Sequence, residues 1–170
     1  MNIIIFSHGK ESGPDGSKIK LLRQVAEKNN FDTVSLDYRQ CNNADERIAL
    51  LENYLESTEA EQIILFGSSM GGYVSTVLAC KKSVKGLFLL CPALYMNDNE
   101  YSYREFKPQC TKIELVHGLN DEVVPYEHSI RFAKENNAVL NLISDDHRLL
   151  NSLAFLEMRF EQFLRHILPS

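Results

Sequence analysis

Residues 61–71 read EQIILFGSSMG: four apolar side chains in succession, a turn of glycine and serine, and the start of a second apolar stretch. A continuous apolar run of this length predicts a strand that is buried on both faces of a sheet. The stretch that follows, residues 70–80, predicts a buried helix. The sequence around position 67 therefore predicts a strand, a tight turn and a helix, the repeating unit of an α/β fold.

The same alternation continues on both sides of this stretch. Apolar residues recur at helical spacing in segments 19–26, 44–55 and 153–167, and Pro125 suits the first turn of a further helix. Short apolar runs lie between these segments, and they predict strands at 3–6, 33–36, 63–66, 87–90, 113–116 and 139–143. We expect a three-layer α/β domain, with about six mostly parallel strands and helices on both faces, that spans residues 1–170.

The composition is that of an ordinary globular protein, with 44% hydrophobic and 24% charged residues. The formal net charge is −5 and no run of Lys and Arg occurs, so we expect no nucleic-acid partner. The first residues, MNIIIFSHG, lack a basic region and have too short an apolar run for a membrane span. These features predict a cytoplasmic protein.

The four cysteines are widely scattered and form no C-x-x-C pair, so we expect free thiols and no metal. They are Cys41, Cys80, Cys91 and Cys110.

The segment from about residue 92 to 109 fits neither a strand nor a helix. Its aromatic and polar residues predict a short cap or pocket wall, in which Leu94, Tyr95 and Met96 could line a substrate pocket. The alternative is that these side chains only cover the sheet.

The turn itself, Gly67-Ser68-Ser69-Met70-Gly71, has the pattern G-x-S-x-G between a strand and a helix. In a nucleophile elbow the turn is so tight that residues two positions either side of the serine must be small. Gly67 and Gly71 meet this need for Ser69, whereas Ser68 has Phe66 at that distance. Ser69 is therefore the candidate nucleophile. The alternative is a glycine-rich turn that merely packs a helix against a sheet.

A serine nucleophile needs a base, and the base needs an acid that orients it. Asp121 follows the strand predicted at 113–116, and His147 follows the last predicted strand. We expect Asp121 as the acid and His147 as the base. The alternatives are a turn or cap role for Asp121, with Glu122 as its replacement, and a surface position for His147.

The other four histidines are weaker candidates for the base. His8 and His117 each precede a glycine at a strand end, where such residues more often shape a loop. His128 and His166 fall on predicted helix surfaces.

Acyl transfer also needs two donors for the oxyanion, one of which is usually the N–H after the nucleophile. Met70 would supply that N–H. The loop after the first strand, Ser7-His8-Gly9-Lys10, would supply the second through the backbone N–H of Lys10. The alternative for this loop is simple flexibility.

Four strings of the sequence, HGK, GSSMGG, HGLNDEVVP and DDHRL, together resemble the successive landmarks of the α/β-hydrolase superfamily. The resemblance spans the chain and is closest to compact single-domain bacterial serine esterases and thioesterases. It implies a mostly parallel sheet, acyl-enzyme chemistry, no cofactor, and Asp121 as the acid. The chain departs from the family pattern in three ways: its first strand matches the family's third, Asp145 and Asp146 precede the histidine, and the cap is short.

From the residues and the resemblance we expect a serine hydrolase of carboxylesterase or thioesterase type (EC 3.1) that acts on small acyl esters or thioesters. The alternatives are an amidase or peptidase with the same triad, and a non-catalytic binding protein of the same fold. A nucleotide-binding module is disfavoured because GSSMGG lacks the lysine and the spacing of a phosphate-binding loop.

Overall fold

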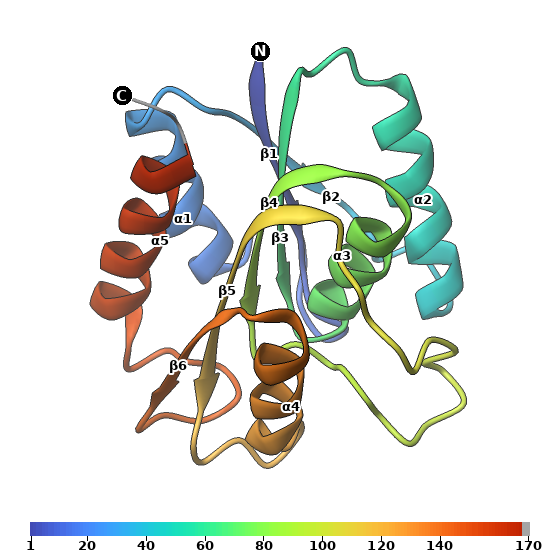
Figure 1. The fold of residues 1–170 in the computed structure, drawn as a ribbon, viewed down its shortest axis with the longest axis vertical. Coiled ribbons are helices and arrows are strands. Elements are labelled where there is room, and N and C mark those ends of the chain that lie inside the picture. Colours follow the sequence, from blue (N-terminus) through green and yellow to red (C-terminus); the bar gives the residue numbers. More distant parts are fainter. Residues whose placement is uncertain (168–170) are drawn as a thin grey trace.

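The computed structural model describes residues 1–167, and its core is one six-stranded sheet (Figure 1). The order of the strands is β2-β1-β3-β4-β5-β6, and every neighbouring pair is parallel. The strands are β1 (Asn2–Ser7), β2 (Asp32–Leu36), β3 (Gln62–Ser68), β4 (Val84–Leu90), β5 (Cys110–Gly118) and β6 (Val139–Ile143). All six include the apolar runs from which they were predicted, so the predicted fold class is confirmed.

Five helices cover the two faces of the sheet: α1 (Ser17–Lys28), α2 (Ala44–Ser57), α3 (Met70–Lys81), α4 (Tyr126–Asn136) and α5 (Leu153–Ile167). α1 and α5 pack on one face, and α2, α3 and α4 pack on the other (Figure 1). Pro125 was predicted in the first turn of a helix, and it stands one residue earlier, as the N-cap of α4. Its ψ of 127° is extended, so the helix starts only at the next residue.

The alternation of side chains along each strand divides the core into two layers. In β1, Ile3 and Ile5 join the layer under α2 and α3, whereas Ile4 and Phe6 join the layer under α1 and α5. α3 lies so deep that its residues from Met70 to Ala79 are all buried. The sheet therefore holds the start of α3 firmly at the carboxyl ends of the strands.

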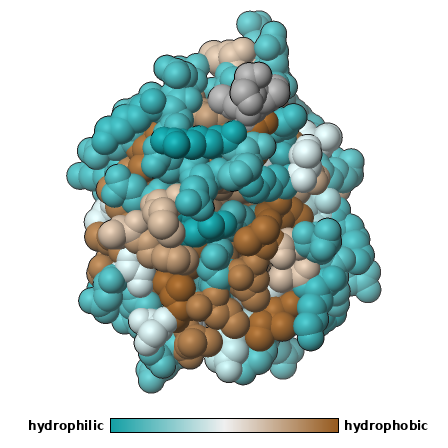
Figure 2. All heavy atoms as spheres, turned by 60° about the vertical axis from the view of Figure 1, so that its left-hand side comes forward, coloured by the Kyte–Doolittle hydropathy of each residue, from teal (hydrophilic) through white to brown (hydrophobic). Residues whose placement is uncertain are grey.

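An aromatic cluster fills the layer between the sheet and α5. The ring of Phe160, which has no exposed surface, lies 5.0 Å from Phe88, 6.1 Å from Phe66 and 6.2 Å from Phe6 (centroid distances). On the outer surface of this side of the molecule, hydrophobic residues gather in the lower half and hydrophilic residues dominate above (Figure 2).

The connection between β4 and β5, residues 91–109, has no helix, and it lies over the α2 and α3 side (Figure 1). Its Tyr101 and Phe106 are buried against Tyr73 of α3, and the Tyr73 hydroxyl accepts a hydrogen bond from the N–H of Tyr103. Ser102 of the same segment donates to Asp45 at 3.3 Å.

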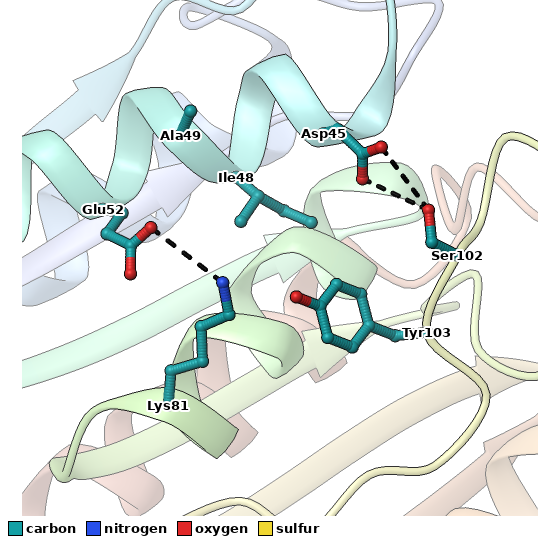
Figure 3. A pocket seen from close by; sticks show the side chains of 7 residues that line it. All are labelled: Asp45, Ile48, Ala49, Glu52, Lys81, Ser102 and Tyr103. Atoms are coloured by element: carbon teal, nitrogen blue, oxygen red, sulfur yellow. Dashed lines mark hydrogen bonds and ion pairs between the residues drawn. The ribbon is translucent and has the colours of Figure 1, made fainter.

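A cavity of about 410 Å³ lies where this segment meets α2 and α3 (Figure 3). Glu52 and Lys81 approach to 4.0 Å across it. Its walls are Asp45, Ile48, Ala49, Glu52, Lys81, Ser102 and Tyr103. None of the residues predicted to act in chemistry borders it.

Within residues 1–167, no helix combines the length and the apolar character that crossing a bilayer requires.

Replacing Phe160 by Ala should lower the free energy of unfolding by about 3–5 kcal/mol, because the aromatic cluster would lose its central ring and keep a cavity. Denaturant unfolding followed by circular dichroism measures the effect. Met158→Ala, on the same helix at a side chain that is 44% exposed, is the control and should change stability by less than about 1 kcal/mol. Equal losses in the two variants would contradict the assigned core.

Candidate active site

Ser69 stands in the turn between β3 and α3 with a strained backbone. Its φ is 52° and its ψ is −119°, a conformation that non-glycine residues rarely adopt. A side chain at Gly71 would collide with the carbonyl group of Ser7, and one at Gly67 would collide with the backbone of Gly71. The two glycines therefore allow α3 to approach β1 and β3 closely enough to form this turn.

The structure brings the three residues Ser69, Asp121 and His147 together at the carboxyl edge of the sheet. His147 Nε2 lies 3.0 Å from Ser69 Oγ, and its Nδ1 lies 2.7 Å from Asp121 Oδ2. A carboxylate can only accept, so Nδ1 carries the proton and Nε2 is free to accept from the serine hydroxyl. The three side chains thus form a directed hydrogen-bond chain with the serine at its open end.

Asp121 holds its negative charge in a buried position. Its side chain has no exposed surface, and four N–H groups lie within 3.0 Å of its two oxygens. The backbone N–H groups of Val123 and Val124 donate to Oδ1 at 2.8 Å. Burial raises the pKa of this carboxyl, but the N–H groups of His117 and His147 and the two backbone donors outweigh burial and hold the pKa well below its usual range.

His117 is the fourth side chain at this position, and the sequence indicated only a loop-shaping role for it. Its fully buried ring places Nε2 3.0 Å from Asp121 Oδ2 and 3.0 Å from the carbonyl oxygen of Val124. Its Nδ1 lies 2.7 Å from the hydroxyl of Ser129 in α4. The signal for this contact was the histidine four positions before Asp121, at the end of the same predicted strand.

Cys91, His117 and Asp121 form the one cluster among residues 1–167 whose ligand atoms lie close enough to hold a metal ion, all within 4.8 Å. Burial raises the pKa of the Cys91 thiol, so the sulfur is neutral rather than a thiolate ligand. The facing atoms of His117 and Asp121 are already in contact with each other. The donor chemistry of this cluster fits a network of N–H groups around a carboxylate better than it fits a metal.

The loop after β1 lies directly against the serine: a Cβ on Gly9 would stand 3.5 Å from the Cβ of Ser69. The carbonyl oxygen of Gly9 lies 2.7 Å from His8 Nδ1 and accepts from Arg47 at 3.4 Å. Since His8 Nε2 accepts from the N–H of Tyr38, its Nδ1 carries the proton and donates to Gly9. Burial lowers the pKa of His8, which favours this neutral form.

These contacts fix the direction of the Lys10 N–H. In a planar trans peptide it points opposite to the Gly9 carbonyl, which is held on the side of His8 and Arg47. Within residues 1–167, neither the N–H of Lys10 nor that of Met70 has a hydrogen-bond acceptor. The two predicted oxyanion donors are therefore both unoccupied.

Three cavities border this group of residues, and their walls combine charged, polar and apolar side chains. One of about 220 Å³ touches Lys10, Met70 and Arg47, and one of about 400 Å³ touches His147. A third, of about 130 Å³, is bordered by Gly9 and Ser68.

The three residues predicted to line a pocket, Leu94, Tyr95 and Met96, border none of these cavities. Leu94 is fully buried, and Tyr95 and Met96 pack against the core under α2, α3 and α4. The Tyr95 hydroxyl donates to Glu135 of α4 at 2.8 Å. These side chains therefore cover the sheet, which was the alternative role considered for them.

Replacing Gly71 by Ala should lower the free energy of unfolding by more than about 3 kcal/mol, the upper end of overpacking effects, because its methyl group would meet backbone atoms that cannot move aside. Gly13→Ala is the control: there the nearest atom to a new Cβ is 3.5 Å away, on the Arg39 side chain. Urea unfolding curves measure both. A stable, soluble Gly71→Ala protein would contradict the close approach.

Asp121 should make stability depend on acid pH. Its folded-state pKa lies below the unfolded value of about 3.9, so the stabilisation is complete above that pH and is lost as the pH falls toward the folded value. Between about pH 4 and pH 2, the free energy of unfolding of the wild type should therefore fall more steeply than that of Asp121→Asn. Glu122→Gln, in the same loop but exposed, should retain the wild-type slope. Curves of unfolding free energy against pH that run parallel for wild type and Asp121→Asn would rule out the effect.

Comparison with solved structures places the fold among hydrolases. A provisionally assigned hydrolase of the α/β superfamily from Xanthomonas campestris pv. campestris is 28% identical, covers 98% of this chain and 99% of its own, and has a TM-score of 0.87. Est1E from Butyrivibrio proteoclasticus is 18% identical over 98% of this chain and 88% of its own, with a TM-score of 0.82. The Pyrococcus furiosus esterase Pf2001 is 17% identical over 97% and 83%, with a TM-score of 0.79.

No curated protein sequence matches the chain. A family model matches residues 3–106, which include the strand, turn and helix around Ser69 and the loop after β1. The structural neighbours and this match, which covers more than half of the chain, show that the protein has the α/β-hydrolase fold and belongs to UPF0227, an uncharacterised protein family.

Proposed function

We propose that the protein is a serine hydrolase that cleaves small acyl esters or thioesters through an acyl-enzyme intermediate. The observation that carries the proposal is the chain from Ser69 Oγ through His147 to Asp121, next to two backbone N–H groups without acceptors. Hydrogen-bonded in this order, the three groups have the geometry of an activated nucleophile, a base and its orienting acid. The hydrolases and esterases among the structural neighbours also support a hydrolase.

In the proposed reaction, Ser69 Oγ attacks the carbonyl carbon while His147 Nε2 takes the hydroxyl proton. The carbonyl oxygen becomes an oxyanion between the N–H groups of Met70 and Lys10. The tetrahedral intermediate then expels the alcohol or thiol, which receives the proton from His147, and the acyl group stays on Ser69. Water then attacks the carbonyl carbon of this acyl-enzyme while His147 Nε2 takes a proton from the water. Ser69 Oγ leaves with that proton, and the carboxylic acid product is released.

Asp121 remains ionised throughout the proposed cycle. It holds His147 with the proton on Nδ1 and stabilises the imidazolium that forms when the base takes the serine proton. The low pKa of its carboxyl suits this role, because the proton stays on the histidine.

The oxyanion donors are fixed before any substrate binds. Met70 N–H is at the first position of a helix that is buried over ten residues, and the Lys10 N–H is oriented by the contacts of His8 and Arg47 with Gly9. Donors that need no rearrangement give the largest stabilisation of a developing charge, about 3–4 kcal/mol for a single donor.

The cavities that border Ser68, Met70 and His147 favour a short substrate that carries a polar group. Their walls carry charged groups such as Lys10, Arg47 and Arg148, and no long apolar channel adjoins the serine among the cavities described above. A short acyl chain with a polar neighbouring group would fit such walls better than a fatty acyl chain.

A fluorophosphonate probe should label wild-type protein at Ser69 alone, because its hydroxyl contacts the base His147 at the edge of the sheet, whereas Ser129, which contacts His117, is fully buried. Ser69→Ala should abolish labelling. Ser68→Ala, which removes the neighbouring hydroxyl, should leave it intact. Peptide mass spectrometry locates the modification. Well-folded wild-type protein that takes up no probe would instead support the non-catalytic binding protein.

His147→Gln should reduce turnover of p-nitrophenyl acetate by about 10⁴-fold or more with the fold intact, since the base is lost. His166→Gln, at an exposed position of α5, should have no effect. Parallel assays with an acetyl thioester and with acetyl p-nitroanilide identify the preferred leaving group. Faster turnover of the anilide than of p-nitrophenyl acetate and the thioester would favour an amidase over our proposal.

A further inference from the structure

His117 is held on both sides of its ring, although the proposed reaction does not require it. Toward α4, Nδ1 lies 2.7 Å from the hydroxyl of Ser129. Toward the loop between β5 and α4, here called the acid loop because it carries Asp121, Nε2 lies 3.0 Å from two oxygens. They are the carbonyl oxygen of Val124 and Oδ2 of Asp121. All of these side chains are fully buried, so bulk water does not compete for the contacts.

These neighbours determine which ring nitrogen carries the proton. The carbonyl of Val124 and the carboxylate of Asp121 can only accept, so Nε2 must be the donor. The hydroxyl of Ser129 can donate or accept, so it pairs with Nδ1 at 2.7 Å in either case. Both ring nitrogens of His117 therefore have a hydrogen-bond partner.

The Nε2–H group reaches both ends of the loop that carries the acid. It fixes the carbonyl of Val124, whose own N–H donates to Oδ1 of Asp121. It also lies against Oδ2, the oxygen that receives the proton of His147 Nδ1. A movement of the His117 ring would therefore move or release the carboxylate that orients His147.

We infer that His117, oriented by Ser129, is a positioning residue that holds Asp121 in line with His147. The inference rests on the proposed function for its catalytic consequence, but the positioning itself is a property of the protein without substrate. A continuous path then runs from α4 to the nucleophile through Ser129, His117, Asp121, His147 and Ser69.

Several charged or ionisable groups surround this path, and none of them is substituted in the variants tested below. Cys91, directly after β4, is the remaining member of the buried cluster around Asp121. On the open side, Glu122, Asp146 and Arg148 share a cavity with His147, and Lys18 of α1 donates to the carbonyl of Arg148. None of these groups lies between His117 and Asp121.

Two polar substitutions separate the two sides of the ring. In His117→Gln the side-chain amide reaches about as far as Nε2, so it keeps a donor for Val124 and Asp121. In His117→Asn the shorter amide matches Nδ1, so it keeps the contact with Ser129 and leaves Asp121 without its fourth N–H. Both variants place an uncharged amide at the same buried position, and each is the control of the other.

The readout is the imidazole nuclear magnetic resonance spectrum of the protein without substrate. In the wild type, Nε2 of His117 should carry a proton, because both of its neighbours are acceptors. The low-field Nδ1 proton signal of His147, which reports its bond to Asp121, should persist in His117→Gln and disappear or move upfield in His117→Asn. The rate of fluorophosphonate labelling should fall up to about 100-fold in His117→Asn and recover in His117→Gln.

Two results would overturn the inference: a His117 ring in the wild type with its proton on Nδ1 alone, or a His147 signal that is unchanged in folded His117→Asn. The first needs no variant, so it decides the question even where His117→Asn does not fold. The spectra need no turnover, so the two proposals can fail separately. If the wild type takes up no probe but His117→Asn still loses the His147 signal, the positioning role stands and only the proposed hydrolase is contradicted.

Discussion

The close approach of α3 to the ends of β1 and β3 is the constraint on which the rest of the site depends. It requires glycine at 67 and 71, and it forces Ser69 into a conformation that the chain would not adopt by itself. The surrounding strands hold that conformation: the N–H of Ser69 donates to Leu90, and its carbonyl accepts from Ala93. The strain is thus balanced by backbone hydrogen bonds from the next strand and its loop. The half-buried serine stays at the edge of the sheet because the sheet fixes its backbone.

The second constraint is a buried negative charge. An isolated carboxylate at the position of Asp121 would be strongly unfavourable, and four N–H groups make the position tolerable. Three of the four come from residues 117–124 of the same chain segment, and the fourth comes from His147. The carboxylate of Asp121 is therefore held by its own loop, and the bond to His147 adds to a carboxylate that is already in place.

Most of the fold could be predicted from the sequence because a two-sided sheet leaves a strong pattern. All six strands appear as apolar runs, but β5 begins three residues before its predicted start. Its first residues, Cys110 to Lys112, include polar side chains, and they join the strand through backbone pairing with Val84 and Gly86. Backbone pairing leaves no mark on hydropathy, so strand ends are predicted less well than strand centres.

The three central residues of the candidate site could also be predicted from the sequence, but the side chains around them could not. Ser69, Asp121 and His147 could be selected because each follows a predicted strand, and the parallel sheet brings those ends to one edge. The contact of His117 with Ser129 and the contacts of Arg47 could not be predicted, since they depend on how α4 and α2 pack. Leu94, Tyr95 and Met96 looked like pocket residues because aromatic and apolar side chains suit both a pocket and a core, and composition does not separate the two.

The packing of α4 shows how closely stability and the site are connected. Only two residues of this helix, Ser129 and Phe132, are buried: Phe132 joins the hydrophobic core, and Ser129 faces His117. A helix with so small a buried face contributes little hydrophobic stabilisation. At one of its two buried positions the helix carries the hydroxyl of Ser129, and a larger apolar side chain there would bury more area. A polar residue at that position is expected where the orientation of the neighbouring histidine matters more than the extra packing. α4 therefore supports the acid loop as much as it covers the sheet.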